Sequence, residues 1–324
     1  MPIERQQRLE QALFRGGQLT MENREYARFV RSFVDPLLEA DLAPRDATVA
    51  ALGIGNSKGE ANVIARETGV AAGLEEYAFI LRNHGLHVTL KKEDGDVFQT
   101  GDTLVRAEGR HKKLLSFERV GLNVLQRMCG IATATQRLQE RARRRCSATR
   151  IVGTRKTPWG LMDKRAIHLG GGGTHRLGLG DGIVIKNNHL ALLARREEQA
   201  VPIALAKAWK ARRGVAFIEV EVRGEEAALV AGHTFKRLQS ELGPIARKKA
   251  PPCLIMLDNM LPEDARTIIV TMRKQRVWDF ALIEVSGGIS ETNLELYAEV
   301  EVDAISIGKL THSVRALDLS QRIS

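Results

Sequence analysis

The spacing of apolar positions changes near residue 150 and divides the chain into two parts with different predicted structure. In the first part, three segments keep the 3.6-residue period of amphipathic helices. They are residues 9–34, 60–84 and 114–142. Pro36 and Gly85 stand where the first two patterns stop, as expected of residues that end helices.

Between the last two helical segments, short apolar pieces replace the helical period. They contain Val88, Leu90, Val97, Leu104 and Val105. The dipeptides Asp94-Gly95 and Gly101-Asp102 divide them and are typical of tight turns, so these pieces predict a small antiparallel sheet. The first ~115 residues are therefore predicted to form an α+β domain.

After residue 150, short apolar strands recur, and each runs into polar residues or glycine. They are Ile151–Val152, Ile183–Ile185, Phe217–Val222, Leu254–Leu257, Ala281–Val285 and Ala304–Ile307. Helical segments separate most of them, which predicts parallel strands joined by crossover helices. These six units, with a candidate seventh strand at Ala166–Leu169, favour an α/β barrel over an open doubly wound sheet. The segment Ala231–Pro252 is long for a crossover and predicts an extended helix followed by a surface loop.

The chain is basic: its 324 residues include 49 Lys and Arg against 39 Asp and Glu, a formal net charge of +10. A hydrophobic content of 44% argues against disorder, and 5% aromatic residues leave few side chains for stacking on single-stranded nucleic acid. The basic run from Arg141 to Arg145 is explained by a solvated helix face or by nucleic-acid binding. A third explanation of the charge is a site for a small polyanion.

Cysteine usage and the start of the chain bear on the compartment. Cys129, Cys146 and Cys253 are odd in number and far apart, which argues against a disulfide framework and a zinc ribbon. The charged start lacks the apolar core of a signal peptide, and no apolar run reaches the ~18 residues of a membrane span. We therefore expect a cytoplasmic protein with no membrane partner.

The densest chemistry lies between Gly153 and His189. Six cations and two acids fall in this segment: Arg155, Lys156, Lys164, Arg165, Arg176, Lys186, Asp163 and Asp181. Several of the cations follow predicted strand ends, where the side chains of a barrel converge. The glycine run Gly170–Gly173 would let a ligand approach the backbone closely. The combination predicts a pocket for an anionic substrate rather than a glycine-rich turn with scattered surface charges, because Arg and Lys both recognise carboxylates.

Two acids stand at later strand ends, Glu221 in IEVEV and Asp258 in IMLDN. Paired carboxylates can act as acid and base or hold Mg²⁺ beside a diphosphate, whereas an ion pair with a crossover helix is the structural alternative. Glu219 shares a strand face with Glu221, but only Glu221 stands at the strand end. The last two strands run into glycine turns that can form anion-binding nests. These turns are Ser286-Gly287-Gly288 and Gly308.

Other kinds of site receive less support. His168, His175 and His189 lack the usual spacing of metal ligands, so we expect hydrogen-bonding roles for them. Neither a nucleophile-elbow motif nor a P-loop motif occurs in the sequence.

Eight ordered motifs give residues 40–324 a close resemblance to the quinolinate phosphoribosyltransferases. They are ERVGLNVLQRMCGIAT, TRKT, GGGGTHRLGL, IKNNH, EVEV, LDN, SGGI and ISIGKLTHS. The resemblance implies an N-terminal open α/β sandwich domain (residues 1–117, joined by the C-terminal segment 312–324) and an incomplete α/β barrel of about seven strands (residues 118–311). It also implies that quinolinate and phosphoribosyl pyrophosphate are the substrates. The reaction would use Mg²⁺ and no organic cofactor. Its products would be nicotinate mononucleotide, CO₂ and pyrophosphate, as a step of NAD synthesis.

Matching the family residue by residue implies a role for each candidate. The residues implied around the quinolinate carboxylates are Arg119, Arg155, His175, Arg176 and Lys186. Lys156 would lie between substrate and sugar phosphate as a catalytic residue. Glu221 and Asp258 would be catalytic at the ribose and would hold Mg²⁺ through the diphosphate or water. The residues implied at the 5′-phosphate are Ser286, Gly287, Gly288 and Gly308.

The chain departs from the family pattern in four places, and these departures leave alternatives open. Gly153 and Asn187 each replace a frequent Asp, and Trp159 interrupts a Pro-Gly-Arg motif. The stretch between Glu221 and Asp258 is also longer than usual. A second hypothesis is a related phosphoribosyltransferase, of the kind associated with molybdenum-transport genes, acting on another aromatic acid. A third is a basic barrel protein that binds nucleic acid.

Arg119 bears on the oligomeric state. In the family, the matching arginine enters the site of the neighbouring subunit, which implies a homodimer or higher homo-oligomer with shared sites. An ordinary surface pair of Glu118 with Arg119 is the structural alternative.

Overall fold

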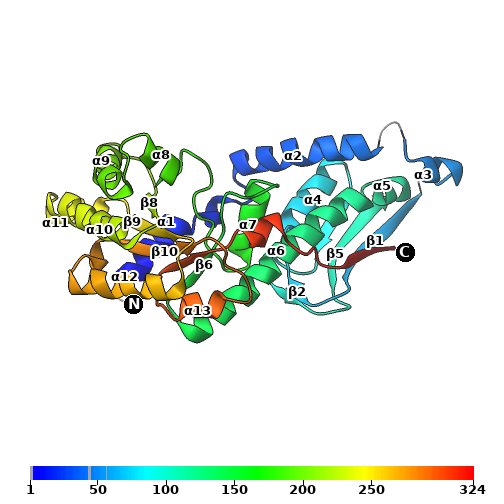
Figure 1. Ribbon diagram of the computed structural model, residues 1–324. Helices are drawn as coiled ribbons and strands as arrows, with labels where there is room; N and C mark the ends of the chain where they lie inside the picture. Colours follow the sequence, from blue (N-terminus) through cyan, green and yellow to red (C-terminus); the bar gives the residue numbers. More distant parts are fainter. Residues whose placement is uncertain (1–2, 43–44, 56) are drawn as a thin grey trace. The chain divides into compact units, whose positions relative to one another are not determined.

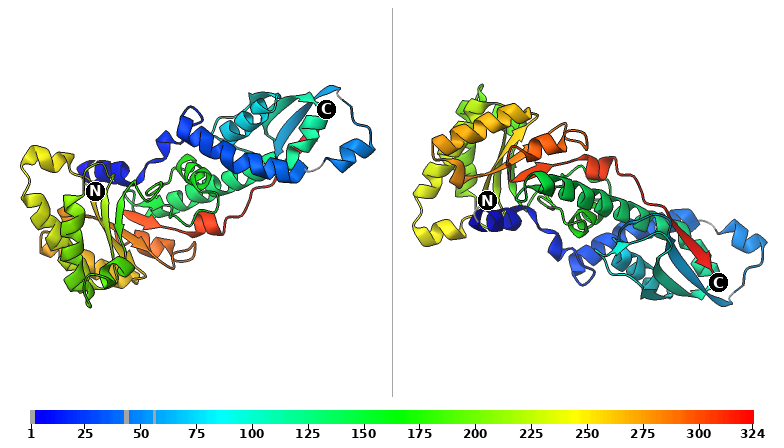
Figure 2. Two further views of the ribbon diagram at one scale, coloured as in Figure 1. Left: turned by 90° about the horizontal axis from the view of Figure 1, so that it is seen from above. Right: turned by 90° about the horizontal axis from the view of Figure 1, so that it is seen from below.

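The computed structural model describes residues 3–42, 45–55 and 57–324, and the chain divides into two compact units (Figures 1 and 2). The barrel unit joins the chain up to Arg15 to residues 138–155 and 172–308. The sandwich unit comprises residues 16–137, 156–171 and 309–324. The boundary at residue 155 separates Arg155 from Lys156, two neighbouring residues of the predicted site.

Six parallel strands form the sheet of the barrel unit, in the order β6-β11-β10-β9-β8-β7. They are β6 (Arg150–Val152), β7 (Ile183–Ile185), β8 (Ile218–Val222), β9 (Cys253–Asp258), β10 (Leu282–Ser286) and β11 (Ala304–Ser306). All six predicted strands are confirmed, and their apolar side chains are buried except for the half-buried Ile183, as continuous apolar runs predict. Among the described residues, β6 and β7 do not pair, so the barrel is incomplete.

The candidate seventh strand at Ala166–Leu169 is wrong, because these residues end helix α7 (Leu161–Leu169) of the sandwich unit. Every side chain from Met162 to Ile167 is buried there, so the run lacks the one-sided pattern that separates a helix from a buried strand. A single parallel bridge from Val152 to Gly173 takes the seventh position instead.

Helix α1 (Ile3–Leu13) closes the end of the barrel unit at which the strands begin. Leu9, Ala12 and Leu13 are fully buried in one apolar cluster. The cluster also contains Val152, Val184, Phe217, Leu254, Leu282 and Ala304. Closure of this end leaves the carboxyl ends of the strands for chemistry, as is general in α/β barrels.

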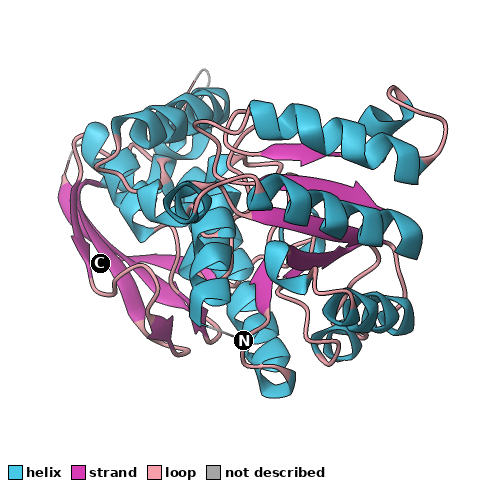
Figure 3. Ribbon diagram, turned by 90° about the vertical axis from the view of Figure 1, so that its left-hand side faces the viewer, coloured by secondary structure: helices cyan, strands magenta, loops and turns pink. Residues whose placement is uncertain are grey.

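Helices cover the outer side of these strands (Figure 3). They are α8 (Asn187–Ala191), α9 (Glu197–Lys210), α10 (Glu225–Ser240), α11 (Pro244–Lys249), α12 (Pro262–Lys274) and α13 (Leu294–Ala298), with the 3₁₀ turn Trp278–Phe280. The region Ala231–Pro252 contains the predicted helix, which is the second half of α10. Where a loop was expected it also contains α11, which begins with Pro244 at its first turn and buries none of its residues.

An antiparallel sheet of order β12-β1-β5-β3 is the centre of the sandwich unit. Its strands are β1 (Lys58–Ala65), β3 (His87–Leu90), β5 (Thr103–Arg110) and β12 (Leu319–Ile323), and β2 (Gly69–Val70) pairs separately with β4 (Val97–Phe98). The predicted antiparallel sheet is thus confirmed, and the C-terminal strand β12 runs beside β1 (Figure 2). The helices are α2 (Arg24–Leu42), α3 (Ala47–Ala51), α4 (Leu74–Asn83), α5 (His111–Ser116), the long α6 (Glu118–Arg145), α7 and α14 (Lys309–His312), with the 3₁₀ turn Gly16–Gln18. Residues 138–145 of α6 belong to the barrel unit.

Two helix predictions are wrong in this unit. Residues 60–65 lie in β1, where Ala61, Val63 and Ala65 are buried in strict alternation. Ile64, which the helical period predicted for residues 60–84 would place beside Ala61 and Ala65 on the buried face, is only half-buried. Pro36 does not end the helix, since α2 continues through it to Leu42. A proline removes one backbone hydrogen bond, and the buried face of α2 on both sides of Pro36 offsets that loss.

A buried acid in the sandwich unit makes stability depend on pH. Glu76 of α4 is fully buried and accepts a hydrogen bond from the Tyr26 hydroxyl at 2.7 Å. Burial, and then the charge of Asp94, raise the pKa of Glu76 to about 7. Because the folded state then holds this proton more tightly than the unfolded state, stability falls as pH rises from the unfolded value of 4.5 to about 7.

Glu76→Gln is expected to remove this dependence while keeping an acceptor for Tyr26. The free energy of unfolding of the variant, compared with that of the wild type at the same pH, should rise by up to about 3 kcal/mol from pH 5 to pH 8. Thermal unfolding at the two pH values measures the difference, and an equal effect of the substitution at both would contradict the assignment.

Candidate active site

The end of β8 places a carboxylate beside a cation of the glycine-rich segment. Glu221 is buried, and its Oε2 accepts a hydrogen bond from Lys186 Nζ at 2.7 Å. Lys186 directly follows β7, the neighbour of β8 in the sheet. Two of the predicted site residues are therefore in contact, and both project from the carboxyl ends of adjacent strands.

The next strand, β9, ends in Asp258, which the sequence analysis also selected. Its carboxylate lies 3.3 Å from Arg223 Nε. Arg223 follows β8, and its backbone N–H donates to Glu197 at 3.1 Å. Sequence reasoning missed Arg223, although its position directly after the IEVEV strand is the signal that could have found it.

The turn after β10 has the form expected of a backbone anion site. Ser286 lies beside Asp258 in the β9–β10 register. Gly287 has φ +94°, and a Cβ atom there would meet Asn259 Oδ1 at 2.2 Å. Gly288 also has positive φ, +63°. The positive φ angles of this turn favour glycine at both positions. Turns of this kind present backbone N–H groups to anions. Gly308 follows β11, the other neighbour of β10.

Two arginines of the predicted pocket are close enough to influence one another. Burial, and then the like charge of Arg155, lower the pKa of Arg176. Arg176 Nη1 donates to the Gly182 carbonyl at 3.1 Å. Among the described residues, no carboxylate forms an ion pair with Arg155, so this part of the barrel unit carries positive charge suited to an anionic ligand.

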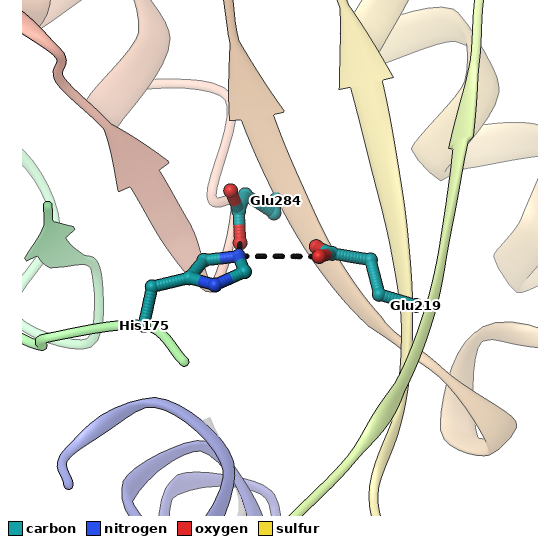
Figure 4. Close-up of side chains that lie close together, drawn as sticks. All are labelled: His175, Glu219 and Glu284. Carbon is teal, nitrogen blue, oxygen red and sulfur yellow. Dashed lines mark ion pairs between the residues drawn. The ribbon is translucent and has the colours of Figure 1, made fainter. Parts of the chain in front are cut away.

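His175, Glu219 and Glu284 form a buried cluster inside the barrel unit (Figure 4). His175 Nε2 lies 3.1 Å from Glu219 Oε2 and 3.6 Å from Glu284 Oε2. Burial is the largest cause that raises the pKa of Glu219 to about 7 and of Glu284 to about 8. The sequence analysis considered Glu219 without assigning it a role and missed Glu284.

The glycine run has a packing role that the sequence did not reveal. In the sandwich unit, a Cβ on Gly170 would meet the Ala132 carbonyl oxygen of α6 at 2.3 Å. In the barrel unit, a Cβ on Gly173 would meet Val152 and the Leu13 carbonyl within 3.2 Å. Close contact with protein, rather than with a ligand, thus explains these two positions.

The remaining candidates, Lys156 and Arg119, lie in the sandwich unit. Both side chains are exposed. The Lys156 carbonyl accepts a hydrogen bond from Thr311 Oγ1 at 2.7 Å. Arg119 stands in the first turn of α6, and Glu118 accepts a hydrogen bond from Gln321 at 3.1 Å. The described residues form no ion pair between Glu118 and Arg119.

The basic run at the end of α6 is partly neutralised within the barrel unit. Arg141 lies 2.7 Å from Glu295 and 3.7 Å from Glu291, and Arg145 lies 3.5 Å from Glu299. These pairs favour the solvated helix face over a nucleic-acid surface. Among the described residues, no helix has the length and apolar character needed to cross a membrane.

Comparison with known families and proteins agrees with this geometry. Residues 131–322 match the quinolinate phosphoribosyl transferase C-terminal domain, and residues 46–129 match the N-terminal domain of the same family. A probable nicotinate-nucleotide pyrophosphorylase (carboxylating) of Methanothermobacter thermautotrophicus is 34% identical over 89% of this chain and 96% of its own length. A probable nicotinate-nucleotide pyrophosphorylase (carboxylating) of Bacillus subtilis is also 34% identical, over 88% of this chain and 90% of its own length.

Solved structures show the same fold. The nicotinate-nucleotide pyrophosphorylase of Francisella tularensis matches with a TM-score of 0.76 at 26% identity, covering 92% of this chain and 96% of that protein. NadC from Streptococcus pyogenes matches with a TM-score of 0.75 at 29% identity, covering 91% and 96%. Strand order, site residues and both domain matches lead to one conclusion: the chain belongs to the quinolinate phosphoribosyltransferase family.

Proposed function

We propose that the chain transfers the phosphoribosyl group of phosphoribosyl pyrophosphate to quinolinate, with decarboxylation, in the de novo synthesis of NAD. The observation that carries the proposal is the arrangement of charge at the strand ends. Lys186 after β7 lies 2.7 Å from Glu221, and Glu221 and Asp258 stand at the carboxyl ends of the adjacent strands β8 and β9. Arg155 and Arg176 add two cations of the same unit. A dianionic pyridine acid and a ribosyl diphosphate together need both kinds of group.

The reaction is a displacement followed by loss of a carboxylate. The quinolinate nitrogen forms a bond to the ribose C1 as the bond from C1 to diphosphate breaks. The bond from C2 of the ring to its carboxylate then breaks and releases CO₂. The electron pair left on C2 is stabilised by the adjacent pyridinium nitrogen and takes up a proton, giving nicotinate mononucleotide.

The residues of this chain act mainly by positioning and by charge. Arg155, Arg176 and Lys186 bind the quinolinate carboxylates and orient the ring nitrogen toward C1. Lys156 lies between quinolinate and the sugar phosphate, and Arg119 completes the carboxylate site. Glu221 and Asp258 face the ribose, where positive charge develops. Ser286, Gly287, Gly288 and Gly308 hold the 5′-phosphate with backbone N–H groups.

Mg²⁺ fits the donor set at the ends of β8 and β9. Glu221 and Asp258 supply carboxylate oxygens, the ligands that Mg²⁺ prefers. Glu221 already pairs with Lys186, and Asp258 with Arg223. Because each carboxylate already has a cation beside it, we propose that the two acids hold Mg²⁺ indirectly, through the diphosphate or through water. When bound, Mg²⁺ neutralises the diphosphate leaving group. The proposed enzyme is a cytoplasmic homodimer or higher homo-oligomer and uses no organic cofactor.

The proposal is tested by incubating the protein with quinolinate, phosphoribosyl pyrophosphate and Mg²⁺. We expect nicotinate mononucleotide, CO₂ and pyrophosphate in equal amounts, with the CO₂ derived from the 2-carboxylate of labelled quinolinate. Activity with another pyridine acid but not with quinolinate would instead support the related phosphoribosyltransferase. A lack of turnover with any such acid would refute phosphoribosyl transfer.

Loss of a cation from the carboxylate pocket is expected to weaken quinolinate binding. Arg155→Ala, Arg176→Ala and Lys186→Ala should each raise the dissociation constant about 10- to 150-fold, since a charge-assisted hydrogen bond contributes about 1.5–3 kcal/mol. Titration calorimetry with quinolinate measures the change. Arg144→Ala, which alters an exposed arginine of α6, serves as the matched control and should bind like the wild type. Unchanged affinity in all three pocket variants would contradict the assignment.

A further inference from the structure

Arg223 lies at the carboxyl ends of the strands of the barrel unit, and the roles proposed above leave it unused. It directly follows β8 and comes two residues after Glu221. Alternate residues of a strand point to the same face, so the row of Glu219 and Glu221, continued by one step, leads to Arg223. Glu219 and Glu221 are buried, whereas the Arg223 side chain is 57% exposed. The row thus runs from the interior of the unit to the end at which a barrel binds its substrates.

The register of the sheet identifies the neighbours of Arg223. Glu221 pairs with Met256 of β9, and two further steps in this register bring Arg223 opposite Asp258. Asp258 pairs in turn with Ser286 of β10. Arg223, Asp258 and Ser286 therefore follow one another across three adjacent strand ends. Ser286 begins the turn that is proposed to hold the 5′-phosphate.

Two contacts hold Arg223 in this place. Its Nε donates to Asp258 Oδ2 at 3.3 Å, so the side chain is directed across the sheet toward β9. Its backbone N–H donates to Glu197 Oε2 of α9 at 3.1 Å. In the part of the chain that the structure describes, no hydrogen bond or ion pair uses Nη1 or Nη2 of Arg223. The guanidinium is thus held by one nitrogen and presents the other two to a ligand.

An ordinary surface ion pair is the structural alternative for Arg223. Such pairs join two exposed side chains, as Arg237 and Glu241 of α10 do, with exposed fractions of 59% and 58%. Asp258 differs, because only 14% of its side chain is exposed. The pair of Arg223 with Asp258 therefore lies at the edge of the proposed substrate site and not on the outer surface of the unit.

The order of groups along these strand ends matches the order of groups in phosphoribosyl pyrophosphate. In the sheet, Asp258 of β9 stands between the turn at Ser286 of β10 and Arg223 after β8. In the substrate, the ribose stands between the 5′-phosphate and the diphosphate. With the 5′-phosphate in the turn and the ribose at Asp258, the diphosphate extends toward Arg223.

Arg223 also has the chemistry that a diphosphate requires. Its planar guanidinium can bind two phosphate oxygens at once, whereas the ammonium of Lys186 acts as a point charge. Lys186 pairs with Glu221 at 2.7 Å, and Arg223 offsets the charge of Asp258 in the same way. The two acids at these strand ends are therefore neutralised toward an anion, and Arg223 still has two nitrogens to offer it.

We propose that Arg223 is a further substrate-binding residue, whose Nη1 and Nη2 donate hydrogen bonds to the diphosphate of phosphoribosyl pyrophosphate. The inference rests on the proposed function as far as it concerns this substrate. Negative charge grows on the diphosphate as its bond to C1 breaks, so the contact becomes stronger in the transition state. Arg223 therefore contributes to turnover as well as to binding, and it neither takes up nor releases a proton.

Inorganic pyrophosphate tests this contact without turnover. In titration calorimetry without Mg²⁺ and at fixed ionic strength, Arg223→Gln should raise the dissociation constant of pyrophosphate about 10- to 150-fold, the range expected for loss of a charge-assisted hydrogen bond. Arg223→Lys keeps the charge but not the two-nitrogen fork, so its affinity should lie between those of the wild type and Arg223→Gln. Arg237→Gln, which changes a similarly exposed arginine of the same unit, is the matched control and should bind like the wild type.

A second pair of titrations separates direct binding from neutralisation of Asp258. If Arg223 only offset the Asp258 charge, Arg223→Gln would have no effect in the Asp258→Asn background. We expect instead a loss of about 10- to 150-fold in both backgrounds, because the diphosphate itself is the partner.

Steady-state kinetics extend the test to the substrate. Arg223→Gln should raise the KM for phosphoribosyl pyrophosphate and lower kcat, with the KM for quinolinate within about twofold of wild type. Unchanged affinity for pyrophosphate in Arg223→Gln, a loss that disappears in the Asp258→Asn background, or an equal rise of both KM values would overturn the proposal. If the protein makes no nicotinate mononucleotide but binds pyrophosphate through Arg223, the proposed function fails and the diphosphate site stands.

Discussion

Arg5→Met is expected to lower the free energy of unfolding by about 3–5 kcal/mol, because it leaves the Asp303 carboxylate buried without its cation. Asp303 is fully buried, and its two oxygens lie 2.7 and 2.5 Å from Arg5. The same guanidinium donates to the carbonyls of Trp278 and Ala281, each at 2.8 Å, and stacks on the Trp278 ring. A methionine of similar length replaces none of these contacts.

Urea denaturation of the two proteins measures the difference. Arg237→Met provides the matched control, since Arg237 and Glu241 form an exposed pair at 3.5 Å that should contribute less than about 1 kcal/mol. Removal of both buried charges, in Arg5→Met with Asp303→Leu, should recover part of the stability, because the unpaired carboxylate causes most of the loss. A loss below about 1 kcal/mol in Arg5→Met would show that α1 is held by its apolar face alone.

The importance of Arg5 could not be predicted from the sequence, because its partner is 298 residues away. The six parallel strands could be predicted, because each apolar run is bounded by glycine or polar residues. Short runs with small residues were ambiguous. Ala61 and Ala65 fit both a helical and an alternating pattern, and only pairing with β5 and β12 selects the strand.

In the candidate site, too, some residues could be predicted from the local sequence and others depend on distant parts of the chain. Residues at strand ends, such as Glu221 and Asp258, could be selected from sequence because a barrel brings these ends together. Glu219 and Glu284 lie inside strands. The role of a charged residue there cannot be assigned until its neighbours across the sheet are known. Their common feature is visible in the sequence only afterwards: each stands two positions before a site residue, Glu221 or Ser286, on the same strand face.

The largest effect on activity is expected from two residues of the sandwich unit. Arg119→Ala and Lys156→Ala should each be inactive alone, because Arg119 is proposed to complete the site of a neighbouring subunit and Lys156 to act in its own. Arg119 is exposed at the start of α6, and Glu118 beside it contacts Gln321. The surface pair that would give Arg119 an ordinary structural role is therefore absent from the described residues.

Mixed dimers of the two inactive variants provide the decisive test. In a mixed dimer, one site combines Lys156 of the first chain with Arg119 of the second and is intact, whereas the other site lacks both. Co-folding should therefore restore up to about half of the wild-type activity per mixed dimer, as the twofold symmetry requires. Differently tagged chains allow the mixed dimers to be purified before assay, and Arg144→Ala paired with Lys156→Ala controls for tagging and refolding. Inactive mixed dimers, or a fully active monomer, would show that Arg119 serves its own chain.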